Sequence, residues 1–324
     1  MKRRTFHSAA ASLGLSLALP VRAQPRSYPT RPISFVIPFP PGGVTDMSAR
    51  LLASAMSRIL GQTVVPENRP GAGGNIAAHY AARASADGYT IFFATSGSHG
   101  VNQSLYSNLP FDPIKDFTPI VYTSSSPNIF VATKNFSGKT IGDFVDMARA
   151  KPGQLTMGLG SLGTSQHMAA ELLRYRTKTD FLTVPYKGGA LALQDLLGGQ
   201  IQTLSDGFPS SIQHVKQGTI KALAVTSTER VAAAPDIPTV AETIPGFSSF
   251  GWFGLAGPAN MPREIVERLN KAANEALQDR DLVKAYTGFG AKIYGGAPEV
   301  FAKHIETELR LWAEVVKATG AKLR

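Results

Sequence analysis

The sequence predicts an α/β protein of two domains, each with a mostly parallel sheet flanked by helices. Two observations lead to this fold class. The chain has 324 residues, of which 43% are hydrophobic, so it is long and apolar enough for two hydrophobic cores. Short apolar runs also alternate with glycine loops and helical patterns along the chain, and repeated strand, loop and helix units are typical of parallel sheets.

The composition excludes several classes of protein. Charged residues make up only 17% of the chain, which argues against disorder. The net charge is +10, but four basic residues lie in the leader described next, which leaves about +6. Because the Lys and Arg residues form no dense block, we expect no nucleic-acid partner. Cysteine is absent, which excludes disulfides, zinc ribbons and cysteine nucleophiles.

Residues 1–23 have the features of an export signal. They comprise a basic start, a small apolar stretch and the sequence Val21-Arg22-Ala23, which predicts cleavage after Ala23. The pair Arg3-Arg4 favours the twin-arginine route, although paired basic residues also open ordinary secretory leaders. No later stretch approaches the ~18 consecutive apolar residues needed to span a bilayer. We therefore expect a mature protein outside the cytoplasm, soluble or at most peripheral.

The first unit of the mature chain lies in residues 33–46, which read ISFVIPFPPGGVTD. The apolar run predicts a strand that ends at the Pro and Gly residues, and a helix follows, with Met47, Leu51, Leu52, Met56 and Ile59 at helical spacing. A Gly-Gly turn before a helix leaves free backbone N–H groups at the positive end of the helix dipole. The turn is therefore either an anion seat or simply a tight connection.

The same order repeats twice more. Residues 63–66 predict a second strand, followed by the glycine loop 67–75 and a helix to about residue 84. Residues 90–95 predict a buried third strand, followed by a small-residue loop at 96–100. In such folds, ligands bind beyond the carboxyl ends of the strands.

Prolines punctuate the segment 109–122, and residues 128–133 after it predict the next strand, with the first crossing between domains near residues 122–130. A second α/β unit follows. Its helices are expected at 140–150 and 164–175, and its strands at 154–158, 183–185, 201–204 and 222–225.

The glycine-laced aromatic run 246–258 predicts a long strand that crosses back, and two helices, 262–277 and 298–319, should then pack on the first domain. The predicted organisation is a leader (1–23), a discontinuous domain 1 (24–125 plus 250–324) and domain 2 (126–249).

Two enzyme hypotheses are alternatives. Residues Gly158 to Gly163 spell G-x-G-x-x-G, and Asp180 follows where a dinucleotide-binding fold places its ribose-binding acid. The export signal and the late position of this motif argue against that hypothesis. An exported hydrolase could use Ser98 or Ser165 with His99 or His167. No nucleophile elbow, phosphate loop or zinc-protease motif occurs, and no histidines show ligand-like spacing, so we expect neither a metal nor a cofactor.

A set of short segments resembles one known family. These segments are residues 28–33, 38–46, 67–74, 87–90, 109–113, 116–119, 185–188, 235–239 and 252–254. Together they resemble the substrate-binding receptors of tripartite tricarboxylate transporters, the Bug family. The resemblance implies a periplasmic binding protein (flytrap) fold, with two domains joined by two crossing strands and closing on a small carboxylate without catalysis.

The resemblance also implies partners and binding residues. The ligand would be an organic acid, an aromatic acid or an amino acid, and the protein would be a periplasmic monomer that serves membrane transporter subunits or a sensor. The implied ligand-binding residues, most of them in two glycine loops, are Phe39, Gly42, Gly43, Thr45, Asp46, Ser96, Ser161, Gly163, Thr164, Ser165 and Asp206. In the second loop this chain departs from the family pattern, since Leu159 replaces a serine, Ser161 a glycine and Met168 a leucine.

Asp206 has two interpretations. It follows the strand predicted at 201–204 and precedes Gly207, so we expect it to point into the crevice between the domains. Alternatively, it is a helix-capping or turn aspartate with no contact to a ligand.

Overall fold

The structure is a computed structural model, and it describes residues 28–323. The leader predicted at residues 1–23 lies outside the described residues. The strands are β1 (Ile33–Ile37), β2 (Val64–Asn68), β3 (Thr90–Thr95), β4 (Phe117–Thr133), β5 (Thr156–Leu159), β6 (Leu182–Pro185), β7 (Thr203–Gly207), β8 (Ile220–Val225), β9 (Phe250–Pro258) and β10 (Lys292–Ile293).

The α-helices are α1 (Val44–Leu60), α2 (Asn75–Ala82), α3 (Asn102–Leu105), α4 (Ile141–Ala150), α5 (Ser165–Thr177), α6 (Gly189–Leu197), α7 (Phe208–Lys216), α8 (Arg263–Ala276), α9 (Arg280–Gly288) and α10 (Pro298–Thr319). Short turns of 3₁₀ helix form η1 (Ala72–Gly74) and η3 (Val240–Glu242), and η2 (Gly97–Val101) is a π-helical segment.

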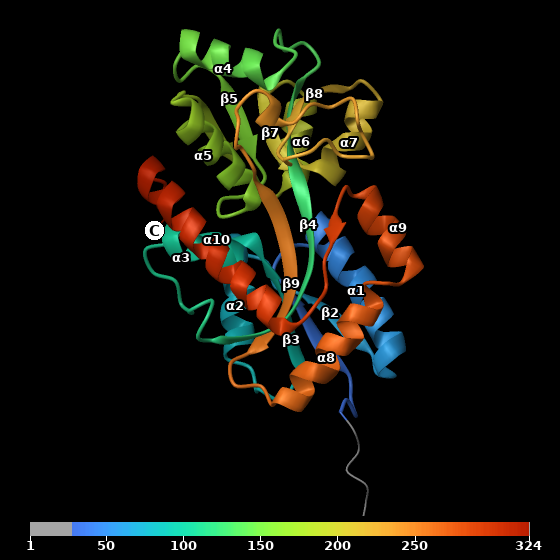
Figure 1. The fold of residues 1–324 in the computed structure, drawn as a ribbon. Coiled ribbons are helices and arrows are strands. Elements are labelled where there is room, and N and C mark those ends of the chain that lie inside the picture. The colour runs from blue at the N-terminus through green and yellow to red at the C-terminus, as the bar shows by residue number, and fades with distance from the viewer. Residues whose placement is uncertain (1–27, 324) are drawn as a thin grey trace, which may run out of the picture.

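A single mixed sheet connects the molecule, with strand order β2-β1-β3-β9-β4-β7-β5-β6 and with β8 and β10 also paired to β4. Strand β4 pairs with β9 through residues 117–127 and with β7 and β8 through residues 128–133. We therefore call residues 28–127 and 250–323 the first half, and residues 128–249 the second half. Figure 1 shows β4 running lengthwise from the first half into the second, with β9 beside its first-half part.

The carboxyl ends of the parallel strands in both halves face the boundary between them. In the first half, β1, β2 and β3 are parallel, and Thr95 at the end of β3 pairs with Phe253 near the start of β9. In the second half, β5, β6 and β7 are parallel, and Gly207 at the end of β7 pairs with Asn128 of β4. Loops that follow these strands are thus brought to one boundary, as the sequence predicts for a ligand crevice.

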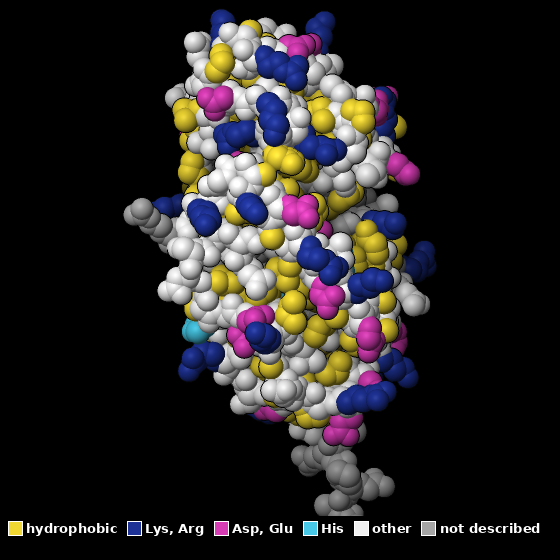
Figure 2. All heavy atoms as spheres, turned by 60° about the vertical axis from the view of Figure 1, so that its left-hand side comes forward, with side chains coloured by type: hydrophobic (Ala, Val, Ile, Leu, Met, Phe, Trp, Pro, Cys, Tyr) yellow, Lys and Arg dark blue, Asp and Glu magenta, His cyan; other side chains and the backbone are white. Residues whose placement is uncertain are grey.

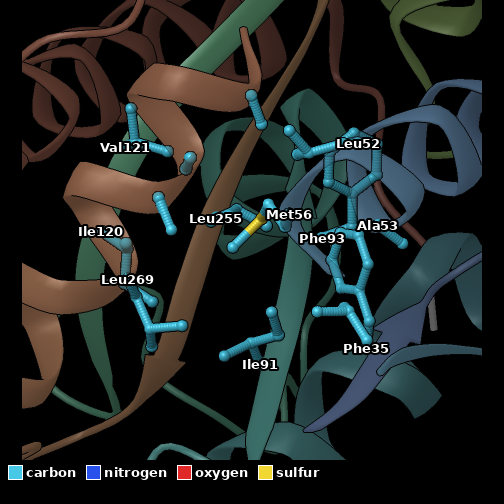
Figure 3. Packing of buried hydrophobic residues seen from close by; sticks show 14 of the residues in the cluster. Phe35, Leu52, Ala53, Met56, Ile91, Phe93, Ile120, Val121, Leu255 and Leu269 are labelled. Atoms are coloured by element: carbon cyan, nitrogen blue, oxygen red, sulfur yellow. The ribbon is translucent and has the colours of Figure 1, made fainter. Parts of the chain in front are cut away.

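The core of the first half lies between helices α1 and α8 and the sheet (Figure 3). Leu52 and Met56 of α1 are fully buried against Leu269 of α8, as the helical spacing predicts. Met47 belongs to the same predicted stripe but is 37% exposed and does not pack against this core, although Val44 in the same first turn does.

The last helix, α10, packs on both halves. Its early residues Phe301 and Ile305 lie in a cluster of the first half with Trp252, whereas Trp312 lies in the main core of the second half. Between them, Glu308 accepts hydrogen bonds from the indole N–H groups of Trp252 (2.8 Å) and Trp312 (2.9 Å). The predicted packing of the last helix on the first domain is therefore present but incomplete, because the apolar face of α10 is long enough to cover part of the second-half core as well.

Two local predictions are wrong. The expected loop at 96–100 is the π-helical segment η2, which is fully buried from Gly97 to Val101 and continues into α3. The strand predicted at residues 128–133 in fact begins at Phe117, inside the proline-punctuated segment. Pro119 is accommodated because the pairing of β4 with β9 shifts between Pro119 and Val121, so a bulge takes the residue that cannot donate a ladder hydrogen bond.

Candidate functional site

The first glycine loop leaves the N-terminus of α1 open. Its N-cap residue is Gly43, which provides no side-chain cap, and residues 40–43 are exposed. Within the described part of the chain, the N–H groups of Gly43, Val44 and Thr45 have no hydrogen-bond acceptor. These unpaired donors lie at the positive end of a 17-residue helix. The geometry is that of an anion seat.

Asp46 holds this loop in shape. Its carboxylate is buried and accepts hydrogen bonds from the Gly42 N–H (2.9 Å), Arg50 Nε (2.9 Å) and Asn68 Nδ2 (2.8 Å). Burial alone would raise the pKa of Asp46, but the hydrogen bonds from Arg50, Gly42 and Asn68 leave this pKa below its ordinary value. Asn68 Nδ2 also donates to the Phe39 carbonyl (2.8 Å). Of the predicted binding residues here, Asp46 and Phe39 thus support the loop, whereas Gly43 and Thr45 carry the free donors.

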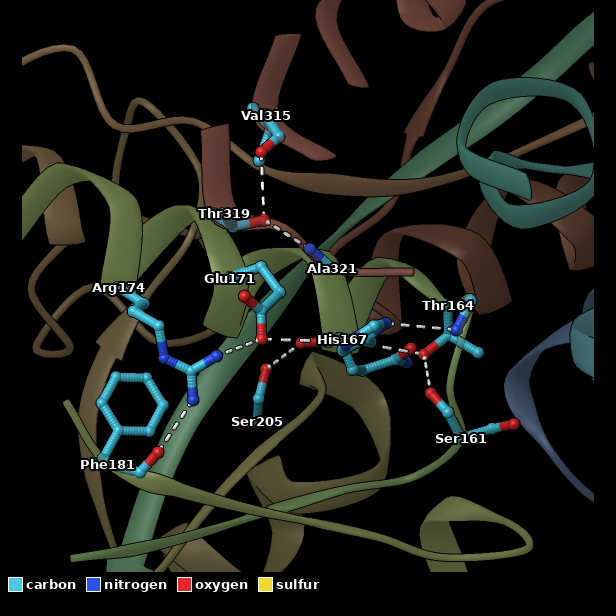
Figure 4. Close-up of polar contacts among 12 residues, drawn as sticks. Ser161, Thr164, His167, Glu171, Arg174, Phe181, Ser205, Val315, Thr319 and Ala321 are labelled. Carbon is cyan, nitrogen blue, oxygen red and sulfur yellow. Dashed lines mark hydrogen bonds and ion pairs between the residues drawn. The ribbon is translucent and has the colours of Figure 1, made fainter. Parts of the chain in front are cut away.

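The second glycine loop is bonded to itself (Figure 4). The Gly163 N–H donates to His167 Nδ1 (3.3 Å), and the Thr164 hydroxyl accepts from the His167 N–H (3.4 Å) and donates to the Ser161 carbonyl (2.8 Å). Ser161 Oγ donates to the Leu162 carbonyl at 3.3 Å. The first turn of α5 is thus partly capped, so the two predicted anion seats differ in how many donors remain free.

His167 must be neutral to hold this loop, because only an unprotonated Nδ1 can accept the Gly163 N–H. Burial lowers the pKa of His167 to about 4, and the nearby Arg174 guanidinium acts in the same direction. The Arg174 guanidinium also pairs with Glu171 and donates to the Phe181 carbonyl at 2.8 Å. These contacts give His167 the structural role of positioning the loop.

The remaining predicted residues lie at the boundary of the halves. Ser96 is buried directly after β3, and Ser165 Oγ donates to Asn128 Oδ1 at 3.1 Å. Asn128 was not predicted from the sequence, although a polar residue at the start of an apolar strand is a usable signal. Its Nδ2 is buried and has no hydrogen-bond partner among residues 28–323.

Asp206 lies inside β7, because this strand spans residues 203–207 rather than the predicted 201–204. Its carboxylate accepts from Ser211 Oγ (2.7 Å) in α7 and from the Gly207 N–H. Only 2% of the residue is exposed, and burial raises the pKa of its carboxyl group to about 6. Helix α7 has Gly207 as its N-cap and no side-chain cap, so these two bonds give Asp206 a structural role at the strand-to-helix turn and not a capping role. A contact between Asp206 and a ligand remains a proposal.

The geometry does not support a hydrolase. Ser98 Oγ lies 3.1 Å from His99 Nδ1, but both residues are fully buried, and the serine also bonds with Thr95. Burial lowers the pKa of His99 to about 3, in surroundings that include the Phe117 ring. Ser165 pairs with Asn128 instead of a histidine. Neither serine has both a free base and access for a substrate.

The dinucleotide hypothesis fails on topology. Gly158 lies inside β5, where an added Cβ would come within 2.4 Å of the Ile201 side chain. Glycine is therefore needed at this position for packing of the strand. Asp180 precedes β6 and its carbonyl accepts from the Gly153 N–H, which precedes the parallel strand β5. It is therefore at the opposite end of the sheet from the loop that follows β5, whereas the ribose-binding acid must lie at the same end.

The described residues offer neither a metal-binding cluster nor a membrane-spanning helix. Residues 28–323 contain no group of three His, Cys, Asp or Glu side chains that could hold a metal ion. No helix within this range is long and apolar enough to cross a membrane. On the face shown in Figure 2, Lys and Arg side chains are scattered among acidic and apolar ones and form no continuous basic surface.

Comparison with known proteins identifies similar chains. Residues 48–321 match the family model described as "Tripartite tricarboxylate transporter family receptor". Protein BugT of Bordetella pertussis is 36% identical over 310 residues, which cover 95% of this chain and 94% of BugT.

Solved structures show the same fold. The R. palustris protein Rpa4515 with adipate is 37% identical, with a TM-score of 0.85, and the match covers 90% of this chain and 98% of that one. MatC from Rhodopseudomonas palustris with bound malate is 34% identical, with a TM-score of 0.83, and the match covers 89% of this chain and all of that one. The predicted two-domain α/β fold is confirmed.

Proposed function

This chain belongs to the family of tripartite tricarboxylate transporter receptors, and on that premise we propose that it binds a small carboxylate between its two halves. The observation that carries the proposal is the open N-terminus of α1, where the N–H groups of Gly43, Val44 and Thr45 have no acceptor among the described residues. A carboxylate suits these donors in both charge and geometry. Two similar proteins were solved with carboxylates, adipate and malate.

The second half supplies the other wall of the proposed site. Ser161 and the first-turn N–H groups of α5 lie at the ends of the second-half strands, at the same boundary as the α1 loop. We assign residues 24–125 and 250–324 to one moving domain and residues 126–249 to the other. Binding energy contributed by both domains would then stabilise a closed state.

Residues 1–23 would direct export to the periplasm, where the monomeric receptor would present its ligand to membrane transporter subunits or to a sensor. We assign the protein no catalytic activity, no cofactor and no nucleic-acid partner. The carboxylate could be an organic acid, an aromatic acid or an amino acid, because backbone donors recognise the carboxylate group itself and leave the rest of the ligand to shape.

We expect a small carboxylate to raise the thermal unfolding midpoint. A ligand at one hundred times its dissociation constant adds about 2.7 kcal/mol, which corresponds to several degrees for a chain of this size. Thermal scanning with a panel that includes malate, adipate, benzoate and glutamate measures this effect, with neutral sugars as controls. A midpoint that responds to a sugar but to none of the acids would refute the proposed function.

A further inference from the structure

The two halves contact each other through glycines that lie outside the proposed carboxylate seat. A Cβ added to Gly97 of the first half would lie 2.5 Å from the Gly163 carbonyl oxygen of the second half and 3.3 Å from the Gly73 carbonyl oxygen. A Cβ on Gly73 would lie 3.1 Å from the Leu162 carbonyl oxygen. Since nonbonded carbon contacts are optimal at about 3.5–4.0 Å, side chains at these positions would hold the two backbones apart.

Asn102 of α3 organises the first-half side of this contact. Its Nδ2 donates to Asn75 Oδ1 (2.6 Å) and to the Gly73 carbonyl (3.2 Å), which ties together the loops after β2 and β3. Its Oδ1 is buried without a hydrogen-bond partner in the described chain, and a Cβ on Gly163 would lie 2.7 Å from it. Asn102 thus faces Gly163 directly across the boundary.

Gly97 is required for space rather than for backbone conformation. Gly163 has a φ of 75°, which favours glycine in any surroundings, but the φ of Gly97 lies outside the left-handed region. Gly97 also begins the π-helical segment η2, a rare conformation that is frequent at functional sites. Within the first half, an alanine at position 97 would be tolerated by the backbone, so its main clash is with the second half.

We propose that Gly73, Gly97 and Asn102 form a docking face that receives residues Leu162 and Gly163 when the halves close. This inference rests on the proposed function, since it concerns closure around the same ligand. The docking face positions the second glycine loop without touching the carboxylate. A side chain at Gly97 would lower the population of the closed state, and the apparent affinity would fall in proportion to that population.

The test compares the parent protein with Gly97→Ala and with the control Gly288→Ala, whose added Cβ would find no atom within 4 Å. Because the chain has no cysteine, Val65→Cys and Leu182→Cys introduce a unique pair of spin-label sites, both exposed, one in each half. Double electron–electron resonance then measures the distance between the halves, without ligand and with malate or adipate. Titration calorimetry with the same two acids measures affinity.

We expect Gly97→Ala to reduce the population with a short distance between the halves, and any measured affinity, at least tenfold. The unfolding midpoint of the ligand-free variant should stay within two degrees of the parent. Gly288→Ala should behave as the parent in all three measurements. If the parent and Gly97→Ala give equal distance distributions under every condition, the proposed docking face is wrong. The same conclusion follows if neither protein shows a compact state. If neither acid binds the parent, the choice of ligand is challenged, and the distance measurement still decides on the docking face.

Discussion

Gly43→Asp is expected to lower the affinity for a small carboxylate at least a hundredfold, with little effect on the stability of the ligand-free protein. Gly43 is the N-cap of α1, and its φ of −82° and ψ of 169° suit a capping residue. An aspartate there would place its own carboxylate on the free N–H groups of the first turn, in competition with the ligand. Losing two charge-assisted hydrogen bonds of about 1.5–3 kcal/mol each gives the expected factor.

Stability should change little because an N-cap aspartate gains only a few tenths of a kcal/mol over glycine, and repulsion from Asp46 offsets part of that gain. The space is available, since a Cβ at Gly43 would meet no atom within 4 Å. Two matched variants separate the causes. Gly43→Ala adds the Cβ without a cap and should bind normally, whereas Gly43→Asn adds a neutral cap and should fall between alanine and aspartate.

Titration calorimetry and thermal unfolding of these three variants measure both quantities. An aspartate variant that binds as tightly as the alanine variant would show that the ligand does not use the N-terminus of α1. The experiment also tests an alternative in which a Lys or Arg side chain holds the carboxylate, because such an ion pair elsewhere would be nearly insensitive to the cap at position 43.

In the first half, the sequence predicts the start of α1 correctly but not the structure of the segment after β3. The start of α1 was predicted correctly because Pro and Gly residues mark the end of β1 and an apolar stripe follows at helical spacing. The loop after β3 was not, because glycine and serine have low helical propensity, and η2 is stabilised by burial between neighbouring elements instead. A Cβ on Gly100, for example, would lie 3.3 Å from Glu308 Cβ of α10, which is a contact no local pattern contains.

Shorter helices were missed for a related reason. Helices α6, α7 and α9 have nine residues each, too few for a clear apolar stripe, and α7 begins with Phe208-Pro209, where proline suggests a turn but in fact occupies the first helical turn. Their stability comes from tertiary contacts, such as that of Phe208 with the core of the second half.

The candidate site was predictable as a set of loops but not as a set of free donors. The spacing of the glycines identifies both loops, yet it does not reveal that His167 takes the N–H of Gly163 while the donors of the α1 loop stay free. That difference depends on the burial of His167, which keeps its imidazole neutral. Asn128 could not be predicted because its place at the boundary depends on long-range strand pairing. At this residue the neighbour of β4 changes from β9 to β7.

Asp206→Asn is expected to make the free energy of unfolding less dependent on pH. Above neutral pH, the variant should be more stable than the parent by up to about 3 kcal/mol. The pKa of Asp206 is raised from 3.8 to about 6 because the group is buried, so the fold favours the protonated acid. The corresponding stabilisation is fully present below about pH 4 and is lost as the pH rises through 6. The gap between the two pKa values is equivalent to about 3 kcal/mol.

Urea unfolding of parent and variant at pH 4, 6 and 8 measures this dependence. Any cost of an asparagine Nδ2 without an acceptor, where Asp206 Oδ1 now faces Gly189, is the same at every pH and cancels when the slopes are compared. Ser211→Ala is the control, because it removes the 2.7 Å hydrogen bond to the carboxylate without removing the titrating group. Parallel pH profiles for the parent and Asp206→Asn would contradict a raised pKa.

The same variant decides whether Asp206 also faces the ligand. If its carboxylate pairs with the ammonium group of an amino-acid ligand, asparagine should weaken that ligand by about ten- to a hundredfold, since the charge-assisted hydrogen bond contributes about 1.5–3 kcal/mol. A plain dicarboxylate should bind unchanged or more tightly, because the variant removes a like charge. Calorimetry at pH 8, where the parent group is ionised, gives the clearest contrast. Identical affinities for glutamate, malate and adipate in both proteins would leave Asp206 with the structural role that its bonds to Ser211 and Gly207 already define.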